Sequence, residues 1–196
     1  MSELEKSAAR FDVNSCNDMY AKLLFEVNRL ENGWSEFDSM NFVFTAHHLY
    51  VDWISRCGTS HAQSKKAELP PGPVLVMQAV IDLSNGNKHW KVDRPGSLKK
   101  QVVTNVTSPL RGDWYSYLVA GPMVYIELND YCISMRELTL QVCGYFAWIL
   151  DENLSHFPSE LVAQLEALRV DRGSAVSAID RHDKHATIGA PQSAVD

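Results

Sequence analysis

Two short stretches of the chain carry side chains that could do acid–base chemistry. In chain order these polar residues are His48, Asp52, Asp82, Asn85, Lys88 and His89. An imidazole beside a carboxylate is held in one tautomer and can take or give a proton near neutral pH. A lysine beside such a pair could hold a phosphate or an oxyanion. We therefore treat these six residues as candidate catalytic residues.

The spacing of these residues places them on two helix faces. Residues four, seven and eleven positions apart lie on the same side of an α-helix. One face consists of Gln78, Asp82, Asn85 and His89, and the other of Thr45, His48, Asp52 and Ser55. If the two faces meet, all six candidates lie in one cleft. If they face water instead, the same residues are ordinary solvated or structural polar groups, and both interpretations stay open.

The same residues also offer a metal-site alternative. His48 and Asp52 could share a metal ion with His89 or Asp82 from the neighbouring helix. Helical bundles usually build such sites with a Glu-x-x-His motif, and this chain has none. We therefore predict neither a metal nor another cofactor, and keep a metal-dependent hydrolase as an alternative. His47 lies nearer the apolar side of its helix, so we expect a core histidine bound to a backbone group.

Apolar residues that recur at helical spacing predict the helices that carry these groups. The expected helices cover about Ser15–Asn32, Phe37–Cys57, Val74–Trp90, Ser134–Leu150 and Ser159–Arg169. The apolar face of the first consists of Cys16, Met19, Tyr20, Leu23, Leu24, Val27 and Leu30. Gly33 and Gly58 can end the first two helices, which should form an antiparallel pair. Ser134 and Glu137 have the spacing of a capping box, and Thr59–Leu69 is expected to be a polar loop.

The segment between the third and fourth helices is rich in valine and aromatic residues, which predicts short strands. The expected strands lie within Gln101–Thr107, Met123–Leu128 and Tyr131–Ile133, with a further strand or a loop at 114–119. Asn129-Asp130 is expected to be a turn. The predicted fold class is therefore mainly α: an antiparallel helical bundle with a small antiparallel β insert, at about residues 100–133, before the last long helix.

Composition limits the organisation and the partners of the chain. Residues 1–171 are predicted to form a single domain, and residues 172–196, which have few large apolar side chains, a disordered tail. Acidic residues outnumber basic ones 24 to 18, which argues against wrapping of duplex DNA but not against a small local RNA contact. Met1–Arg10 has no apolar stretch typical of a signal peptide, and no apolar run reaches the ~20 residues of a membrane span. We therefore expect a cytoplasmic protein without membrane association.

The two polar segments together resemble a group of uncharacterised prokaryotic helical proteins. Those proteins pair a His-Leu-x-x-Asp-Trp helix, here His48–Trp53, with an Asn-x-x-Lys-His helix end, here Asn85–His89. A short β segment and a closing helix follow, so that the pattern covers about Leu23–Leu150 of this chain. That group is similar to the HEPN-like helical domains of toxin–antitoxin and phage-defence systems.

The resemblance implies a short helical bundle, a homodimer and, as in many HEPN proteins, metal-independent RNA cleavage by an Arg–His pair from each subunit. Arg56 and His61 have the spacing of that pair, but Cys57 stands where a polar residue is usual and Gly58 should break the helix. Other HEPN-like proteins are not catalytic and bind a partner or a nucleotide. We therefore predict a protein that binds a protein partner or RNA, with a ribonuclease that uses the polar cleft as the alternative.

Overall fold

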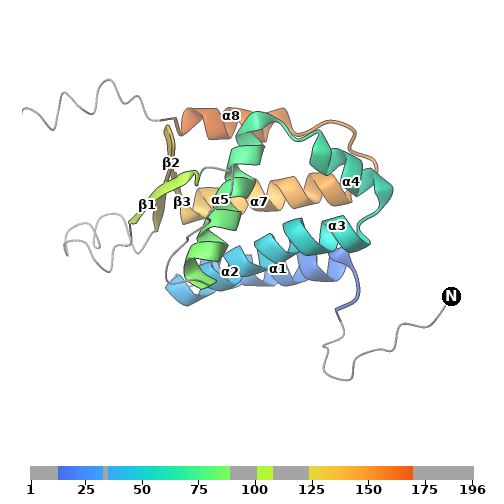
Figure 1. Ribbon diagram of the computed structural model, residues 1–196, viewed down its shortest axis with the longest axis horizontal. Helices are drawn as coiled ribbons and strands as arrows, with labels where there is room; N and C mark the ends of the chain where they lie inside the picture. Colours follow the sequence, from blue (N-terminus) through green and yellow to red (C-terminus); the bar gives the residue numbers. More distant parts are fainter. Residues whose placement is uncertain (1–12, 33–34, 89–100, 108–123, 170–196) are drawn as a thin grey trace, which may run out of the picture.

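The computed structural model describes residues 13–32, 35–88, 101–107 and 124–169 (Figure 1). Its helices are α1 (Cys16–Asn32), α2 (Glu36–His48), the π-helical η1 (Leu49–Trp53), α3 (Ile54–Cys57), α4 (Ser60–Ala67), α5 (Pro71–Lys88), α7 (Met135–Leu150) and α8 (Ser159–Ala167). The strands β1 (Val103–Thr107), β2 (Tyr125–Leu128) and β3 (Tyr131–Ser134) form an antiparallel sheet in that order. The predicted class, mainly helical with a small antiparallel sheet, is confirmed.

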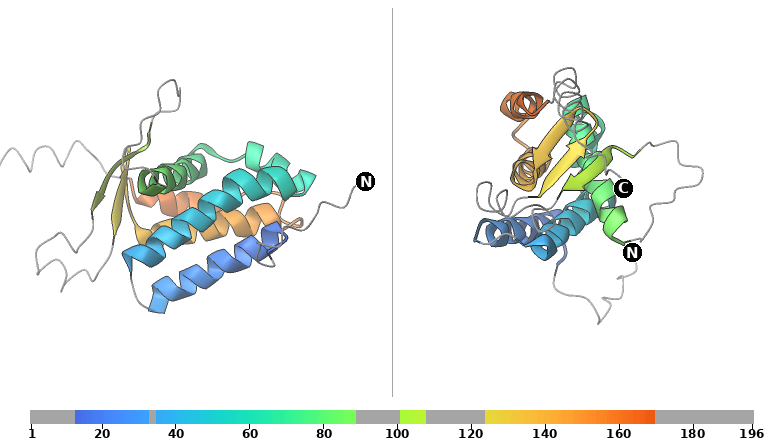
Figure 2. Two further views of the ribbon diagram at one scale, coloured as in Figure 1. Left: turned by 60° about the horizontal axis from the view of Figure 1, so that its bottom comes forward. Right: turned by 90° about the vertical axis from the view of Figure 1, so that its left-hand side faces the viewer.

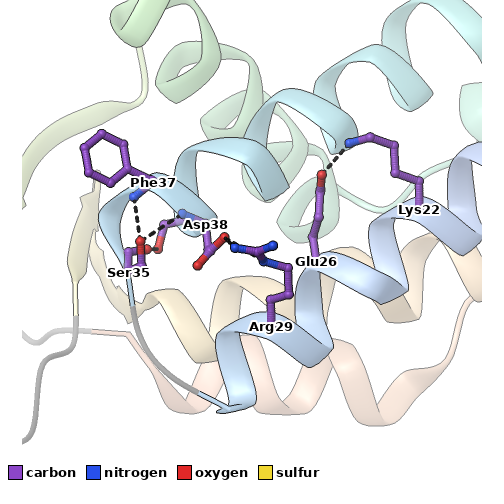
Figure 3. Close-up of polar contacts among 7 residues, drawn as sticks. Lys22, Glu26, Arg29, Ser35, Phe37 and Asp38 are labelled. Carbon is purple, nitrogen blue, oxygen red and sulfur yellow. Dashed lines mark hydrogen bonds and ion pairs between the residues drawn. The ribbon is translucent and has the colours of Figure 1, made fainter.

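Polar contacts help to hold the first two helices together. Ser35 begins α2, because its hydroxyl oxygen accepts hydrogen bonds from two backbone nitrogens of the first turn, at 3.1 and 3.3 Å. Arg29 of α1 donates to Asp38 of α2 at 2.9 Å. Figure 3 shows these contacts and also the ion pair of Lys22 and Glu26, which lies earlier in α1. Figure 2 shows α1 and α2 side by side, as expected for the first two helices.

Helix α7 is central to the core. It packs against α1, α4, α5, α8 and β3, and its buried apolar residues are Met135, Leu138, Val142, Tyr145, Phe146, Trp148 and Ile149. They form one core with Leu23 of α1, Phe42 of α2 and Met77 of α5. Burying a large apolar side chain stabilises a fold by roughly 1.5–3 kcal/mol, so this helix contributes a large part of the driving force for folding.

Both ends of α7 are capped. Ser134 accepts a hydrogen bond from the backbone nitrogen of Glu137 at 3.2 Å, and the Glu137 carboxylate accepts one from the backbone nitrogen of Ser134 at 2.6 Å. This is the predicted capping box. At the other end, the buried side chain of Lys65 donates to the carbonyl oxygens of Trp148, at 2.8 Å, and Asp151, at 2.6 Å. Lys65 therefore provides hydrogen bonds to carbonyl groups that would otherwise have no partner at the end of the helix.

The polar segment after Gly58, predicted to be a loop, contains helix α4. Thr59 caps this helix by accepting a hydrogen bond from the backbone nitrogen of Ala62 at 3.2 Å. The buried residues of α4 are Ala62 and Lys65, so the segment lacks the apolar repeat by which a helix is predicted. Gly58 separates α4 from α3, and a Cβ atom there would collide with the carbonyl oxygen of Ile54.

The helix predicted over Phe37–Cys57 is continuous but changes its hydrogen bonding in the middle. In η1 the backbone nitrogen of Ile54 donates to the carbonyl oxygen of Leu49, five residues earlier. Lys66 of α4 donates to the carbonyl oxygen of Tyr50 within this wider turn, and its ammonium lies 4.2 Å from the centre of the Tyr50 ring. Helix α4 therefore supports the π-helical segment from outside. Such segments are often found at functional sites.

The sheet lies at one end of the helical bundle (Figures 1 and 2). Asn129, in the turn between β2 and β3, has a φ of 47°, a left-handed conformation that asparagine tolerates better than most residues. The predicted Asn129-Asp130 turn is thus confirmed. Strand β1 pairs with β2 and has an irregularity between Val103 and Asn105. Strand β3 leads directly into α7.

Several sequence predictions fall on residues outside the described ranges. They concern the strand or loop at 114–119, the tail at 172–196 and His89. The division into one domain and a tail stays a prediction. Among the helices that the structure describes, none combines the length and the apolar character needed to cross a membrane.

Replacing Lys65 tests whether it caps the end of α7. Lys65→Met keeps the apolar stem but removes the donors to two carbonyl groups, so we expect the free energy of unfolding to fall by about 2 kcal/mol. Urea unfolding followed by circular dichroism measures this. Ala67→Met, at an exposed position of the same helix, is the control and should change stability by less than about 0.5 kcal/mol. Equal effects of the two variants would contradict the capping role.

Candidate functional site

His48, Asp52 and Arg56 form a line along α2, η1 and α3, which we call the polar stripe. The side chains of His48 and Arg56 are 48% and 77% exposed. His48 Nδ1 donates to Asp52 Oδ2 at 3.0 Å, and Arg56 Nη2 lies 3.5 Å from Asp52 Oδ1. An ionised carboxylate only accepts hydrogen bonds, so the Nδ1 atom of His48 carries a proton, and Nε2 of the neutral imidazole is the atom that could accept another. The stripe thus has the parts of an oriented general base beside an anion-binding guanidinium.

The charge state of the polar stripe follows from its contacts. The hydrogen bond from His48 lowers the pKa of Asp52, with a further contribution from the positive charge of Arg56, although partial burial opposes them. Asp52 is therefore ionised at neutral pH. The contacts of ionised Asp52 therefore stabilise the fold at pH values above the ordinary pKa of an aspartate. This stabilisation is lost as the pH falls through the lowered pKa of Asp52. Because the stripe is largely exposed, water and salt screen this contribution to stability.

Asp82 of α5 lies in a different environment. The residue is 3% exposed. Its Oδ1 accepts a hydrogen bond from Gln78 at 3.1 Å, and its Oδ2 accepts one from the backbone nitrogen of Val102 at 2.7 Å. Val102 immediately precedes strand β1, so Asp82 fastens the beginning of the sheet to the helical bundle.

His47 links α2 to α5. Its Nδ1 lies 2.6 Å from the hydroxyl oxygen of the buried Ser84, a hydrogen bond in which the tautomer of the ring decides which atom donates. We predicted a backbone partner for His47, whereas this contact is with a side-chain hydroxyl. The His47 ring also stacks on the ring of His48, with centroids 5.7 Å apart and planes inclined by 16°. The polar stripe is therefore next to the contact between α2 and α5.

The structure places the six predicted site residues in different environments. The first two are joined in the polar stripe. Asp82 is buried against the beginning of β1, and Asn85 is half-buried further along α5. Lys88 is the last residue of α5, but its side chain and the whole of His89 lie outside the described residues. The single cleft between two polar helix faces therefore stays a prediction.

The metal-site alternative depends on residues from both polar faces. Within the ranges that the structure describes, no group of three or more His, Cys, Asp and Glu side chains could hold a metal ion. His48 and Asp52 supply two adjacent donor groups. The third ligand named in the sequence analysis, His89, lies outside these ranges, so this alternative is untested.

An open groove between α1 and α7 is a feature that the sequence analysis missed. It has a volume of about 430 Å³ and is lined by Leu24, Val27, Leu30, Glu31, Arg136, Thr139, Leu140 and Cys143. Leu24 and Leu140 are 43% and 55% exposed. Leu24 fits the apolar repeat of α1, so the sequence alone predicts it as core. The sequence does contain one sign of this groove. Leu140 is a large apolar residue that lies outside the buried stripe of its helix.

The α1–α7 groove contains no reactive thiol, although Cys143 lines it. Burial raises the pKa of the Cys143 thiol to about 12, and the negative charge of Glu31 adds to this effect. The thiol is therefore protonated at neutral pH and a poor nucleophile. The charged residues that line the groove are Glu31 on α1 and Arg136 on α7. The groove is suited to apolar contact with a partner rather than to covalent chemistry.

Comparison of the chain with known protein families, with curated proteins and with solved structures found no match. The HEPN-like resemblance therefore depends on the quoted motif residues alone and stays a prediction. What the chain does must be inferred from the geometry of the polar stripe and of the α1–α7 groove.

Asp82 and Asp52 form a matched pair for testing which carboxylate supports the fold. Asp82→Ala removes the acceptor for buried donors, so we expect the free energy of unfolding to fall by about 2–3 kcal/mol. Asp52→Ala removes an exposed ion pair and should cost less than about 1 kcal/mol. Urea unfolding of both variants at neutral pH measures the difference. A loss for Asp82→Ala no larger than for Asp52→Ala would show that Asp82 does not hold the sheet to the bundle.

Proposed function

We propose that this protein acts by binding a partner in the α1–α7 groove rather than by catalysis. The observation that carries this proposal is the groove itself, an open recess of about 430 Å³ with exposed leucines on both of its sides. Two exposed leucines that border one recess favour a contact that covers them, because the removal of apolar surface from water is favourable. A partner that covers Leu24 and Leu140 would remove from water the area that the fold leaves exposed.

The use of the polar residues supports binding over catalysis. Asp82, a predicted member of the catalytic cleft, has its carboxylate engaged by Gln78 and by the backbone before β1. Lys65 is engaged by the carbonyl groups at the end of α7. These contacts give both side chains structural roles, and a general acid or base must instead reach a substrate atom.

The HEPN-like character and a toxin–antitoxin or phage-defence setting are part of this proposal. They are supported by the motifs at His48–Trp53 and Asn85–His89, and by nothing else in the chain. RNA is a second class of partner that the resemblance suggests. A cytoplasmic location belongs to the same proposal.

Site-specific photo-crosslinking tests binding in the α1–α7 groove. Benzoylphenylalanine placed at Leu24 or at Leu140 should, in cells of the native host, give one discrete adduct of the same mass from both positions. The matched control is Leu154, which is 43% exposed outside the groove and should give no such adduct. If positions 24 and 140 crosslink no more than position 154, the groove is not a binding site.

A second candidate function, a metal-independent ribonuclease, is favoured by the polar stripe. Asp52 orients the His48 imidazole, which leaves Nε2 to act as a base, and Arg56 lies beside the same carboxylate. An arginine at this place could stabilise the charge of a pentacovalent phosphorane. RNA cleavage of this kind needs no metal ion.

Incubation of labelled single-stranded and hairpin RNAs with the purified protein in EDTA tests the ribonuclease candidate. Cleavage is expected in EDTA, with a rate at least about 100-fold lower in His48→Ala, because general acid–base catalysis is typically worth that factor or more. His156→Ala, at an exposed histidine outside the stripe, should cleave like the wild type. Intact RNA after incubation with the wild type would remove this candidate.

A further inference from the structure

We infer that the outward side of α1 carries a binding site for a neutral saccharide, in an open recess that is separate from the α1–α7 groove. This recess, which we call the α1–α2 recess, has a volume of about 370 Å³. It is lined by Phe25, Asn28, Arg29 and Asn32 of α1 and by Asp38 of α2. None of these residues lines the α1–α7 groove, so the inference does not depend on the proposed function.

Two asparagine side chains of the α1–α2 recess leave one donor and one acceptor for a ligand. Nδ2 of Asn32 donates to the backbone carbonyl oxygen of Asn28 at 2.8 Å and to the side-chain oxygen of Asn28 at 2.5 Å. A backbone carbonyl oxygen only accepts hydrogen bonds, which fixes the orientation of both amide groups. Among the described residues, Nδ2 of Asn28 has no acceptor and Oδ1 of Asn32 has no donor.

Arg29 and Asp38 supply a second donor and a second acceptor. Nε and Nη2 of Arg29 both lie 2.9 Å from Oδ1 of Asp38, and Figure 3 shows Arg29 reaching from α1 to this carboxylate. The contact does not use Oδ2 of Asp38 or the remaining N–H groups of Arg29. The side chain of Asp38 is 14% exposed and that of Arg29 is 56% exposed. The more buried carboxylate therefore fixes the guanidinium group while leaving it accessible to a ligand.

The charges of the α1–α2 recess favour a neutral ligand. Arg29 and Asp38 have opposite charges that offset each other at 2.9 Å, and the other three lining residues are uncharged. An anion gains attraction from Arg29 but is repelled by Asp38, and a cation meets the reverse combination. A phosphate group therefore gains little net attraction, which disfavours a nucleotide as the ligand.

The pairing of donors with acceptors favours a saccharide among neutral ligands. A hydroxyl group both donates and accepts hydrogen bonds, so one hydroxyl can contact Asn28 and Asn32 together. A second hydroxyl can contact Arg29 and Asp38 in the same way. A single peptide group has one donor and one acceptor and would use only one of these pairs. The ring of Phe25, which is 63% exposed, offers an electron-rich face against which the C–H groups of a pyranose ring can pack.

Saturation-transfer NMR on the full chain tests this site. The probes are the neutral disaccharides maltose, cellobiose, lactose and N,N′-diacetylchitobiose, each at about 10 mM. At least one of them should bind with a Kd of about 1 mM, because an open site with few contacts gives low affinity. In a titration with that disaccharide, the side-chain amide signals of Asn28 and Asn32 should shift.

Substitutions at exposed positions assign the binding to the α1–α2 recess. Phe25→Ala should weaken binding of that disaccharide about ten-fold, because it removes the apolar surface under the sugar ring. Asn28→Asp should weaken it similarly, since it replaces the free donor with an acceptor. The matched control is Phe37→Ala, which should bind like the wild type. Phe37 is 78% exposed, does not line the recess, and has a ring that points away from Arg29 and Asp38 in Figure 3.

Three outcomes would overturn the inference. The first is that none of the four disaccharides binds, and the second is that Phe25→Ala binds as tightly as Phe37→Ala. The third is that adenosine monophosphate or a blocked dipeptide, tested at the same concentration, shifts the amide signal of Asn28 when no disaccharide does. Circular dichroism of the three variants should match the wild type, because each changed side chain is exposed.

Discussion

The burial of helix α7 is the constraint on which the rest of the structure depends. Four helices and a strand pack around it, and its side chains provide much of the aromatic core. A helix that ends among other helices leaves carbonyl groups that water does not easily reach. Lys65 reaches these carbonyl groups from α4, and its ammonium also lies 5.2 Å from the centre of the Trp148 ring. The position of α4 is thus tied to the end of α7.

The same packing accounts for the α1–α7 groove. Near the beginning of α1, large rings fill the space between the helices, and the rings of Tyr20 and Phe146 have centroids 6.4 Å apart. Toward the sheet, the α7 side chains that face α1 include the smaller Thr139 and Cys143. The groove therefore lies where smaller side chains take the place of the rings between the two helices.

Burial also separates the roles of chemically identical side chains. Asp82 and Asp52 are both aspartates in polar helix stripes. The buried Asp82 accepts hydrogen bonds from a glutamine and a backbone nitrogen, and it joins helix to sheet. Asp52 stays in contact with water, where it orients His48 and attracts Arg56. A carboxylate that is removed from water needs hydrogen-bond donors from the protein. A carboxylate at the surface is solvated by water and can also orient a neighbouring side chain.

Local signals were sufficient to predict much of the fold. The capping box of Ser134 and Glu137 and the turn at Asn129 involve neighbouring residues, so the sequence contains all the information that they need. Helix α4 was missed because one of the side chains that it buries is Lys65. A lysine can bury its aliphatic stem, but it does not count as an apolar residue when a sequence is searched for an apolar repeat. The pairing of His48 with Asp52 was predicted because four residues on a helix bring two side chains together.

The sequence by itself determined the helical class, the order of the elements apart from α4, and local contacts such as the capping box of α7, because these depend on residues less than about two turns apart. Tertiary structure decided which polar side chains are buried and which leucines are left at a surface. It turned Asp82 into a link to β1 and left Leu24 and Leu140 on either side of a groove. These outcomes depend on how helices that are distant in the sequence pack against each other and on the sizes of the side chains between them. The spacing of residues along one helix contains no information about that packing.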